Sequence, residues 1–148
     1  MKLVVQRVAH AHVNVNGKTV GEIEKGFVVL LGVANNDTTK TADYLVNKLC
    51  NLRVFTDEQN KMNLSLNHIN GQLLIISQFT LYADCKKGNR PSFIAAADPN
   101  KANELYEYFK KQCKELGYFV ESGIFGEHME VSLLNDGPVT ILMEKEEN

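Results

Sequence analysis

The stretch Gln72-Leu-Leu-Ile-Ile-Ser-Gln-Phe-Thr-Leu-Tyr-Ala83 decides how this chain folds. It follows the turn signal Asn70-Gly71 and begins with the unbroken apolar run Leu73-Leu-Ile-Ile76. A short apolar run that contains β-branched residues and is bounded by a turn predicts a strand buried on both faces. We therefore expect a central strand here, continuing through Leu81 and Tyr82.

Three polar side chains, Ser77, Gln78 and Thr80, interrupt the end of this predicted strand. Buried polar groups cost free energy unless each finds a hydrogen-bond partner. Neighbouring backbone could supply these partners, and so could a substrate bound in a pocket at the end of the strand. The pocket is the interpretation that the rest of the chain favours.

The first part of the chain predicts three strands. Residues 2–15 alternate in polarity, Asn16-Gly17 is a strong hairpin signal, and residues 18–23 return as a second strand. A turn at Glu24-Lys-Gly26 leads into the apolar run 27–33, which would complete an antiparallel meander.

Two amphipathic helices are predicted. Asn35-Asn-Asp37 offers caps for the first, whose apolar residues recur at helical spacing from Ala42 to Cys50. Asp98-Pro99 begins the second, because Asp caps free N–H groups and Pro is favoured at the first helical position. Gly117 fits its C-terminal end.

The remaining elements are short strands joined by polar turns, and Asn135-Asp-Gly-Pro138 would be the tight turn between the last two. The strands are expected at residues 52–55, 118–120, 130–134 and 139–143, with a partly ordered connection at 62–66. This pattern predicts an α+β fold: a single domain spanning residues 1–148, with a mostly antiparallel, barrel-like β-sheet and two main helices packed on it.

Composition limits the classes of function. The chain has 148 residues, 44% apolar and 23% charged, as in ordinary globular domains. No apolar run approaches the roughly 20 residues that cross a bilayer, so we expect a cytoplasmic protein without membrane contact. A net charge of −2 gives no overall signature of nucleic-acid binding, and the best local candidate is Lys86-Lys-Gly-Asn-Arg90.

We expect no metal and no cofactor. His10 and His12 share one face of a predicted strand, but no cysteine cluster or nearby carboxylate completes a zinc site. The chain also lacks GxSxG, GxGxxG and P-loop motifs. Thr80 could be a nucleophile, yet a hydroxyl needs an adjacent base, and the nearest carboxylate in sequence is Asp84.

Two separated motifs carry a resemblance to a known family. Ser77-Gln-Phe-Thr-Leu81 together with Asn135-Asp-Gly-Pro-Val-Thr140 resembles the signature pair of the D-aminoacyl-tRNA deacylases. The likeness covers nearly the whole chain, including Val4-Val-Gln-Arg-Val8 and Gly88-Asn-Arg-Pro-Ser-Phe93. Gly126-Glu-His-Met129 departs from the family pattern, where smaller or more acidic residues precede the methionine, so His128 would alter the rim of the pocket.

The resemblance implies a homodimer that hydrolyses the ester between a D-amino acid and the 3′-terminal adenosine of tRNA. Glycyl-tRNA formed on tRNA-Ala would also be cleaved. The Gly137-Pro138 bond would be cis and would enter the active site of the other protomer, where its carbonyls block an L side chain.

The resemblance also assigns roles to individual residues. The backbone at Phe79 and Thr80 would stabilise the developing oxyanion, and the ribose 2′-hydroxyl of the substrate would activate water. The implied catalytic residues are Ser77, Gln78, Phe79 and Thr80; the implied substrate-binding residues are Arg7, Phe125, Met129, Gly137 and Pro138; and the implied tRNA phosphate contacts are Lys86, Lys87 and Arg90. Arg7 would lie near Gly137-Pro138 and fix the orientation of its carbonyls through a charge-assisted hydrogen bond.

Three alternatives stay open. The first is an esterase of small esters with Thr80 as nucleophile, and the second is a non-catalytic RNA-binding module. The third is a purely structural dimerising protein, which would leave the polar residues at the end of the central strand without an explanation.

Overall fold

The first half of the sheet is an antiparallel ribbon in which one long strand pairs with two shorter strands. In the computed structural model, which describes residues 1–147, strand β1 (Lys2–Val15) pairs with both β2 (Lys18–Ile23) and β3 (Gly26–Gly32). Ala11 lies opposite Ile23 and Val8 opposite Gly26, so β2 and β3 follow one another along the same edge of β1. The predicted meander is therefore wrong, because the chain does not reverse between β2 and β3.

The centre of the sheet is parallel. Strand β6 (Gln72–Ser77) pairs in parallel with β3 on one side and with β7 (Val120–Ser122) on the other. A parallel strand covered on both faces needs apolar side chains on both, and residues 73–76 are at most 2% exposed.

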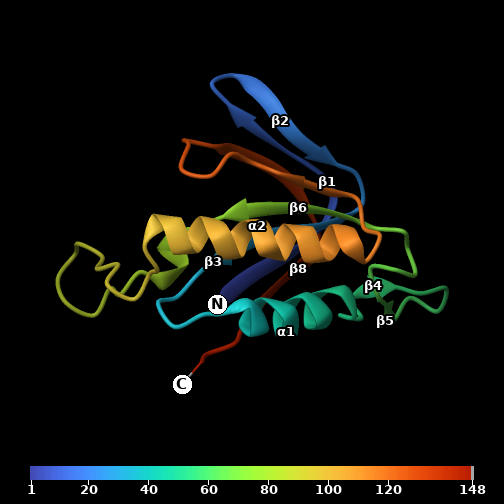
Figure 1. Cartoon of the computed structure of the whole chain (residues 1–148). Helices are drawn as coiled ribbons and strands as arrows, with labels where there is room; N and C mark the ends of the chain where they lie inside the picture. Colours follow the sequence, from blue (N-terminus) through green and yellow to red (C-terminus); the bar gives the residue numbers. More distant parts are fainter. Residues whose placement is uncertain (148) are drawn as a thin grey trace.

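The sheet nearly closes on itself, and two helices cover it. The pairing path runs β2-β1-β3-β6-β7, with β2 and β3 paired to different halves of β1. Strand β8 (Glu130–Glu144) pairs antiparallel with β1. A Cβ atom placed on Gly21 of β2 would lie 2.7 Å from the carbonyl oxygen of Ser122 in β7, which shows how closely the two ends approach. The predicted α+β, barrel-like fold is confirmed, although its sheet is mixed (Figure 1).

The two helices pack against each other and share one apolar core with the sheet (Figure 1). Helix α1 (Thr39–Cys50) is capped by Thr38, whose N–H donates to the Thr41 hydroxyl at 2.9 Å, and not by residues 35–37 as predicted. Helix α2 (Pro99–Glu115) begins as predicted, because Asp98 accepts the first free N–H groups. No helix among the described residues is both long and apolar enough to cross a membrane.

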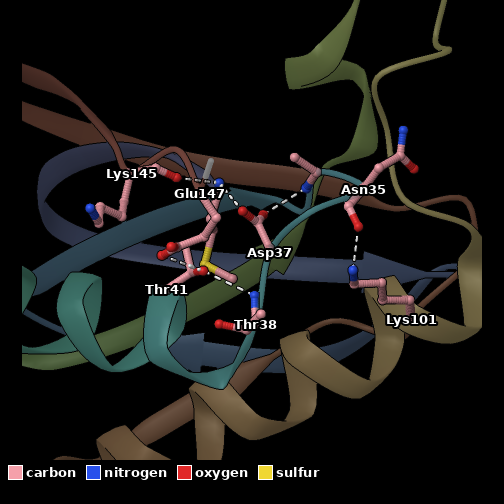
Figure 2. A network of polar contacts seen from close by, with 9 residues as sticks. Asn35, Asp37, Thr38, Thr41, Lys101, Lys145 and Glu147 are labelled. Atoms are coloured by element: carbon pink, nitrogen blue, oxygen red, sulfur yellow. Dashed lines mark hydrogen bonds and ion pairs between the residues drawn. The ribbon is translucent and has the colours of Figure 1, made fainter.

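Asp37 was predicted as a possible cap of the first helix, but its carboxylate instead binds the N-terminus of the chain. Its carboxylate accepts a hydrogen bond from the N-terminal ammonium group of Met1 at 2.7 Å and another from the N–H of Ala34 at 2.7 Å; Asp37 is labelled at the centre of this network in Figure 2. The ammonium group also donates to the carbonyl of Lys145 at 2.8 Å. This buried ion pair joins the start of β1, the entry to α1 and the end of β8.

The predicted central strand ends earlier than expected. β6 stops at Ser77, and Phe79–Tyr82 forms a short 3₁₀ helix, η1, held by hydrogen bonds from Leu81 N–H to the Gln78 carbonyl and from Ala83 N–H to the Thr80 carbonyl. A small hairpin of β4 (Phe55–Thr56) and β5 (Met62–Leu64) replaces the strand predicted at 52–55.

The predicted turn at Asn135–Pro138 is also wrong, since β8 continues in the same direction through it. Val8 lies opposite Asn135 and Gln6 opposite Thr140, so the four residues between Asn135 and Thr140 face Arg7 alone. We call residues 136–139 the β8 bulge. The Gly137–Pro138 peptide bond within it is cis.

Candidate active site

A cavity of about 550 Å³ opens where β6 passes into η1. The predicted site residues that line it are Ser77, Gln78, Phe79, Phe125 and Met129, and the rest of the wall is mainly apolar and includes the first turn of α2. The structure therefore brings together five of the predicted residues, from two segments that lie far apart in the sequence.

The strand that carries Ser77 is fixed from the side of α2. The hydroxyl of Tyr106 donates to the carbonyl of Ile75 at 2.8 Å in the buried interface between α2 and β6. Burial raises the pKa of Tyr106 to about 12, so this hydroxyl stays a neutral donor over the physiological range. The helix and the cavity wall are thereby held in one position relative to each other.

Thr80 does not line the cavity, although Gln78 and Phe79 do. Its hydroxyl accepts a hydrogen bond from the Gln78 side-chain amide at 2.6 Å and is otherwise exposed. The backbone N–H groups of Phe79 and Thr80 lie in the first turn of η1, where helical N–H groups have no intrahelical acceptor. These N–H groups can donate hydrogen bonds without a side-chain base, and Phe79 lines the cavity.

A tight turn at residues 124–127 forms another part of the cavity wall. The N–H of Glu127 donates to the carbonyl of Ile124 at 3.2 Å, and Gly126 between them has a φ of +82°, which glycine adopts without strain. Phe125 lies within this turn and Met129 two residues after it, and both line the cavity together with Glu127 and His128. His128 thus lies on the cavity wall, where its departure from the family pattern had indicated.

Phe93 also lines the cavity, although no role was predicted for it. Its ring packs edge-on against Phe79 with the ring centroids 5.0 Å apart, and both rings line the cavity. The available signal was its position in the Gly88–Phe93 segment that resembles the family.

Arg7 and the β8 bulge form a second group, which does not line the cavity of the same protomer. Arg7, a residue only 9% exposed, donates from Nε to the Asp136 carbonyl at 2.9 Å and from Nη1 to the Val54 carbonyl at 2.6 Å. Arg7 was predicted to orient the carbonyls of Gly137-Pro138; the carbonyl it holds belongs to Asp136, one residue earlier.

The side chain of Asn135 closes the base of the bulge. Its amide donates to the carbonyl of Arg7 at 2.9 Å and to the carbonyl of Val139 at 3.0 Å. Gly137 and Pro138 are exposed at the outer side of the bulge. These two residues are thus presented to the surroundings on a backbone fixed at both ends.

The cationic residues Lys86, Lys87 and Arg90 lie on an exposed loop that projects from the body of the molecule (Figure 1). Two hydrogen bonds between the backbones of Asp84 and Ser92, of 2.8 and 2.9 Å, close this loop at its base. His10 and His12 lie elsewhere, on β1, and no cluster of three or more His, Cys, Asp or Glu side chains suited to a metal ion occurs among residues 1–147.

Comparisons with known proteins agree with the motifs. Residues 4–144 match the family described as D-Tyr-tRNA(Tyr) deacylase. The chain is 58% identical over 145 residues to the D-aminoacyl-tRNA deacylase of Thermosipho melanesiensis and 57% identical over 144 residues to that of Thermosipho africanus, with 97% of each chain covered in both cases. A solved structure named c-Myc DNA Unwinding Element Binding Protein superposes with a TM-score of 0.94 at 40% identity, covering 99% of this chain and 100% of that one. The chain therefore belongs to the D-Tyr-tRNA(Tyr) deacylase family.

Proposed function

We propose that this protein is a hydrolase that cleaves the ester bond of D-aminoacyl-tRNA and releases free tRNA and the D-amino acid. The observation that carries this proposal is the cavity in which Ser77, Gln78 and Phe79 meet Phe125 and Met129 in a chain of this family. The apolar walls of this cavity suit the adenine and ester of a tRNA 3′ end. We propose the cytoplasm as the location of the protein, because translation uses aminoacyl-tRNA there.

The chemistry we propose is attack of water on the ester carbonyl. The oxyanion that forms would accept hydrogen bonds from the N–H groups of Phe79 and Thr80, which lie in the first turn of η1. The 2′-hydroxyl of the terminal ribose would take part in activating the water, and the ribose 3′-oxygen would leave with a proton. Gln78 would support this geometry through its bond to Thr80.

Selection for the D enantiomer would come from the β8 bulge of a second protomer. Gly137 and Pro138 are exposed and lie outside the cavity of their own protomer, which supports a role in a partner's cavity within a homodimer. Their backbone would face the α-carbon of the substrate and clash with an L side chain, while a D side chain points away. Glycine has no side chain to clash, so glycyl-tRNA formed on tRNA-Ala would also be a substrate.

The experiment that tests this function compares matched D- and L-tyrosyl-tRNA with the purified protein and EDTA present. Rapid loss of the D ester, with the L ester spared, is the expected result. Equal cleavage of both would leave an esterase but refute the role of Gly137-Pro138 in selection. Cleavage of neither would favour the non-catalytic nucleic-acid-binding alternative.

Thr80→Ala is expected to keep appreciable activity on D-tyrosyl-tRNA, within about tenfold of the unaltered protein, because its backbone N–H remains and only a positioning contact from Gln78 is lost. Single-turnover rates with the D ester measure this. A loss of roughly 10⁴-fold with the fold intact, the scale found for essential members of catalytic triads, would establish Thr80 as the nucleophile.

A further inference from the structure

A groove of about 430 Å³, separate from the cavity, begins where η1 ends, and Tyr82 and Ala83 line it. Two lysine side chains line its wall, Lys2 from the start of β1 and Lys86 from the exposed loop, against one carboxylate, Asp84. Because Asp84 Oδ1 accepts the backbone N–H of Lys86 at 3.0 Å, part of its charge is already satisfied locally. The groove therefore favours an anion.

One of the two lysines, Lys2, is positioned by an aromatic ring that lines this groove. The ammonium group of Lys2 lies over the ring of Tyr82, 4.7 Å from its centroid. The backbone of Lys86 is anchored beside the groove, because Asp84, two residues earlier, is hydrogen-bonded to Ser92 at the base of the loop, whereas the Lys86 side chain is exposed. A positioned cation such as Lys2 loses less side-chain entropy on binding an anion than a free lysine would.

The groove lies close to the cavity. Phe79, the first residue of η1, lines the cavity, and Tyr82, the last, lines the groove. With a rise of about 2 Å per residue in a 3₁₀ helix, the two sites are about 6 Å apart along η1. A single extended nucleotide spans that length.

We propose that this groove binds the phosphodiester backbone of the single-stranded tRNA segment next to the 3′-terminal adenosine, with Lys2 and Lys86 as the phosphate contacts. The inference rests on the proposed function, which places the terminal adenosine in the cavity. It adds Lys2 and a defined path, over η1, to the cationic loop.

The surroundings of Tyr82 restrict where the RNA backbone lies. A neighbouring cavity that shares Tyr82 with the groove is lined by the carboxylates of Asp37, Glu146 and Glu147. Burial first, and then the charges of Asp37, Glu144 and Glu146, raise the pKa of Tyr82. Phosphates are repelled from this acidic side, which leaves the lysine side of Tyr82 as their path.

The kinetic test uses Lys2→Gln, Lys86→Gln and the double variant. With D-tyrosyl-tRNA, the double variant is expected to raise KM about tenfold at unchanged kcat, and to reduce the slope of log(kcat/KM) against log[salt] by about 1.4, or 0.7 for each lost contact with a single strand. With D-tyrosyl-adenosine, which carries no phosphate, all variants should match the unaltered protein.

The controls separate charge from structure. Lys18→Gln removes an exposed lysine opposite Val15, at the far end of β1 from Lys2, and should change neither KM nor salt dependence. Lys2→Arg keeps the charge and should restore most of the affinity. An equal loss on D-tyrosyl-adenosine, or no change of KM on D-tyrosyl-tRNA, would refute the groove as a phosphate site.

A footprint on Cys85 gives a readout that does not depend on hydrolysis. Cys85 lines the groove and is exposed, whereas Cys50 and Cys113 are buried. Uncharged tRNA is expected to slow labelling of Cys85 by a bulky maleimide severalfold, and the same tRNA shortened by its last three nucleotides should protect less. Equal labelling with and without tRNA would refute the inference even in an active deacylase, while protection in a protein without deacylase activity would refute only the proposed function.

Discussion

Replacing Gly26 with alanine is expected to leave almost no folded protein. A Cβ atom at this position would lie 1.9 Å from the carbonyl oxygen of Gln72 and 2.5 Å from its backbone nitrogen. These are backbone atoms of the first residue pair in the parallel ladder between β3 and β6, so no side-chain rotation relieves the clash. We expect a loss of more than about 4 kcal/mol, at the extreme of single substitutions and close to the whole stability of a small domain.

Soluble yield and thermal unfolding followed by circular dichroism measure this effect, with Gly88→Ala as the matched control. Gly88, unlike Gly26, has a positive φ, of +64°, but a Cβ atom there would have no neighbour within 4 Å. Its replacement carries only the backbone strain of a left-handed residue, about 1–2 kcal/mol, and should give a folded protein with a modestly lower Tm. A Gly26→Ala protein as stable as Gly88→Ala would show that the parallel ladder can move apart at little cost.

The elements that the sequence predicted correctly are those set by local chemistry. Asn16-Gly17 forms the expected hairpin turn with positive φ at both residues, and Asp98 caps α2 with Pro99 in its first turn. The apolar run of β6 was recognised as a doubly buried strand. Each of these signals lies within a few residues of the feature that it predicts.

The wrong predictions with the largest effect on topology concern pairing between distant segments. An apolar run predicts that a strand is buried on both faces, but it does not tell which strands lie beside it or in which direction they run. The β8 bulge shows the same limit. Asn135-Asp-Gly-Pro138 is locally compatible with a hairpin turn, yet β8 pairs with β1 on both sides of the bulge, and the Asn135 side chain donates a hydrogen bond to the carbonyl of Arg7, 128 residues away.

The candidate site was predictable where buried polarity marked it. Ser77 and Gln78 drew attention because hydroxyl and amide groups end an apolar strand, and the cavity lies there. Phe93 carried no such signal, since an aromatic residue in a loop is equally compatible with packing. The partner of Arg7 was misplaced by one residue because the register of the bulge depends on the fold.

Arg7→Lys is expected to lower kcat/KM for D-tyrosyl-tRNA by about 100-fold, on the scale of a 1 Å displacement at a reacting centre, and to narrow the ratio between D and L substrates. The planar guanidinium bridges the Asp136 and Val54 carbonyls at once, and Asp136 directly precedes Gly137. An ammonium group on a flexible stem cannot reproduce that fork. The β8 bulge would then lose the orientation that we propose it needs to exclude an L side chain.

The matched control is Arg53→Lys. Arg53 is exposed, directly precedes Val54, and donates a hydrogen bond to the carbonyl of Asn63 at 3.1 Å. This control should leave the rates of hydrolysis of the D and L substrates unchanged. Arg7→Lys leaves a buried carbonyl without its donor, so its Tm should also fall, by an amount equivalent to about 1–3 kcal/mol. The discriminating quantity is consequently the D/L ratio: a lower Tm with an unaltered ratio would assign Arg7 to folding alone, whereas a collapsed ratio in a protein that remains folded would tie the guanidinium to enantiomer selection.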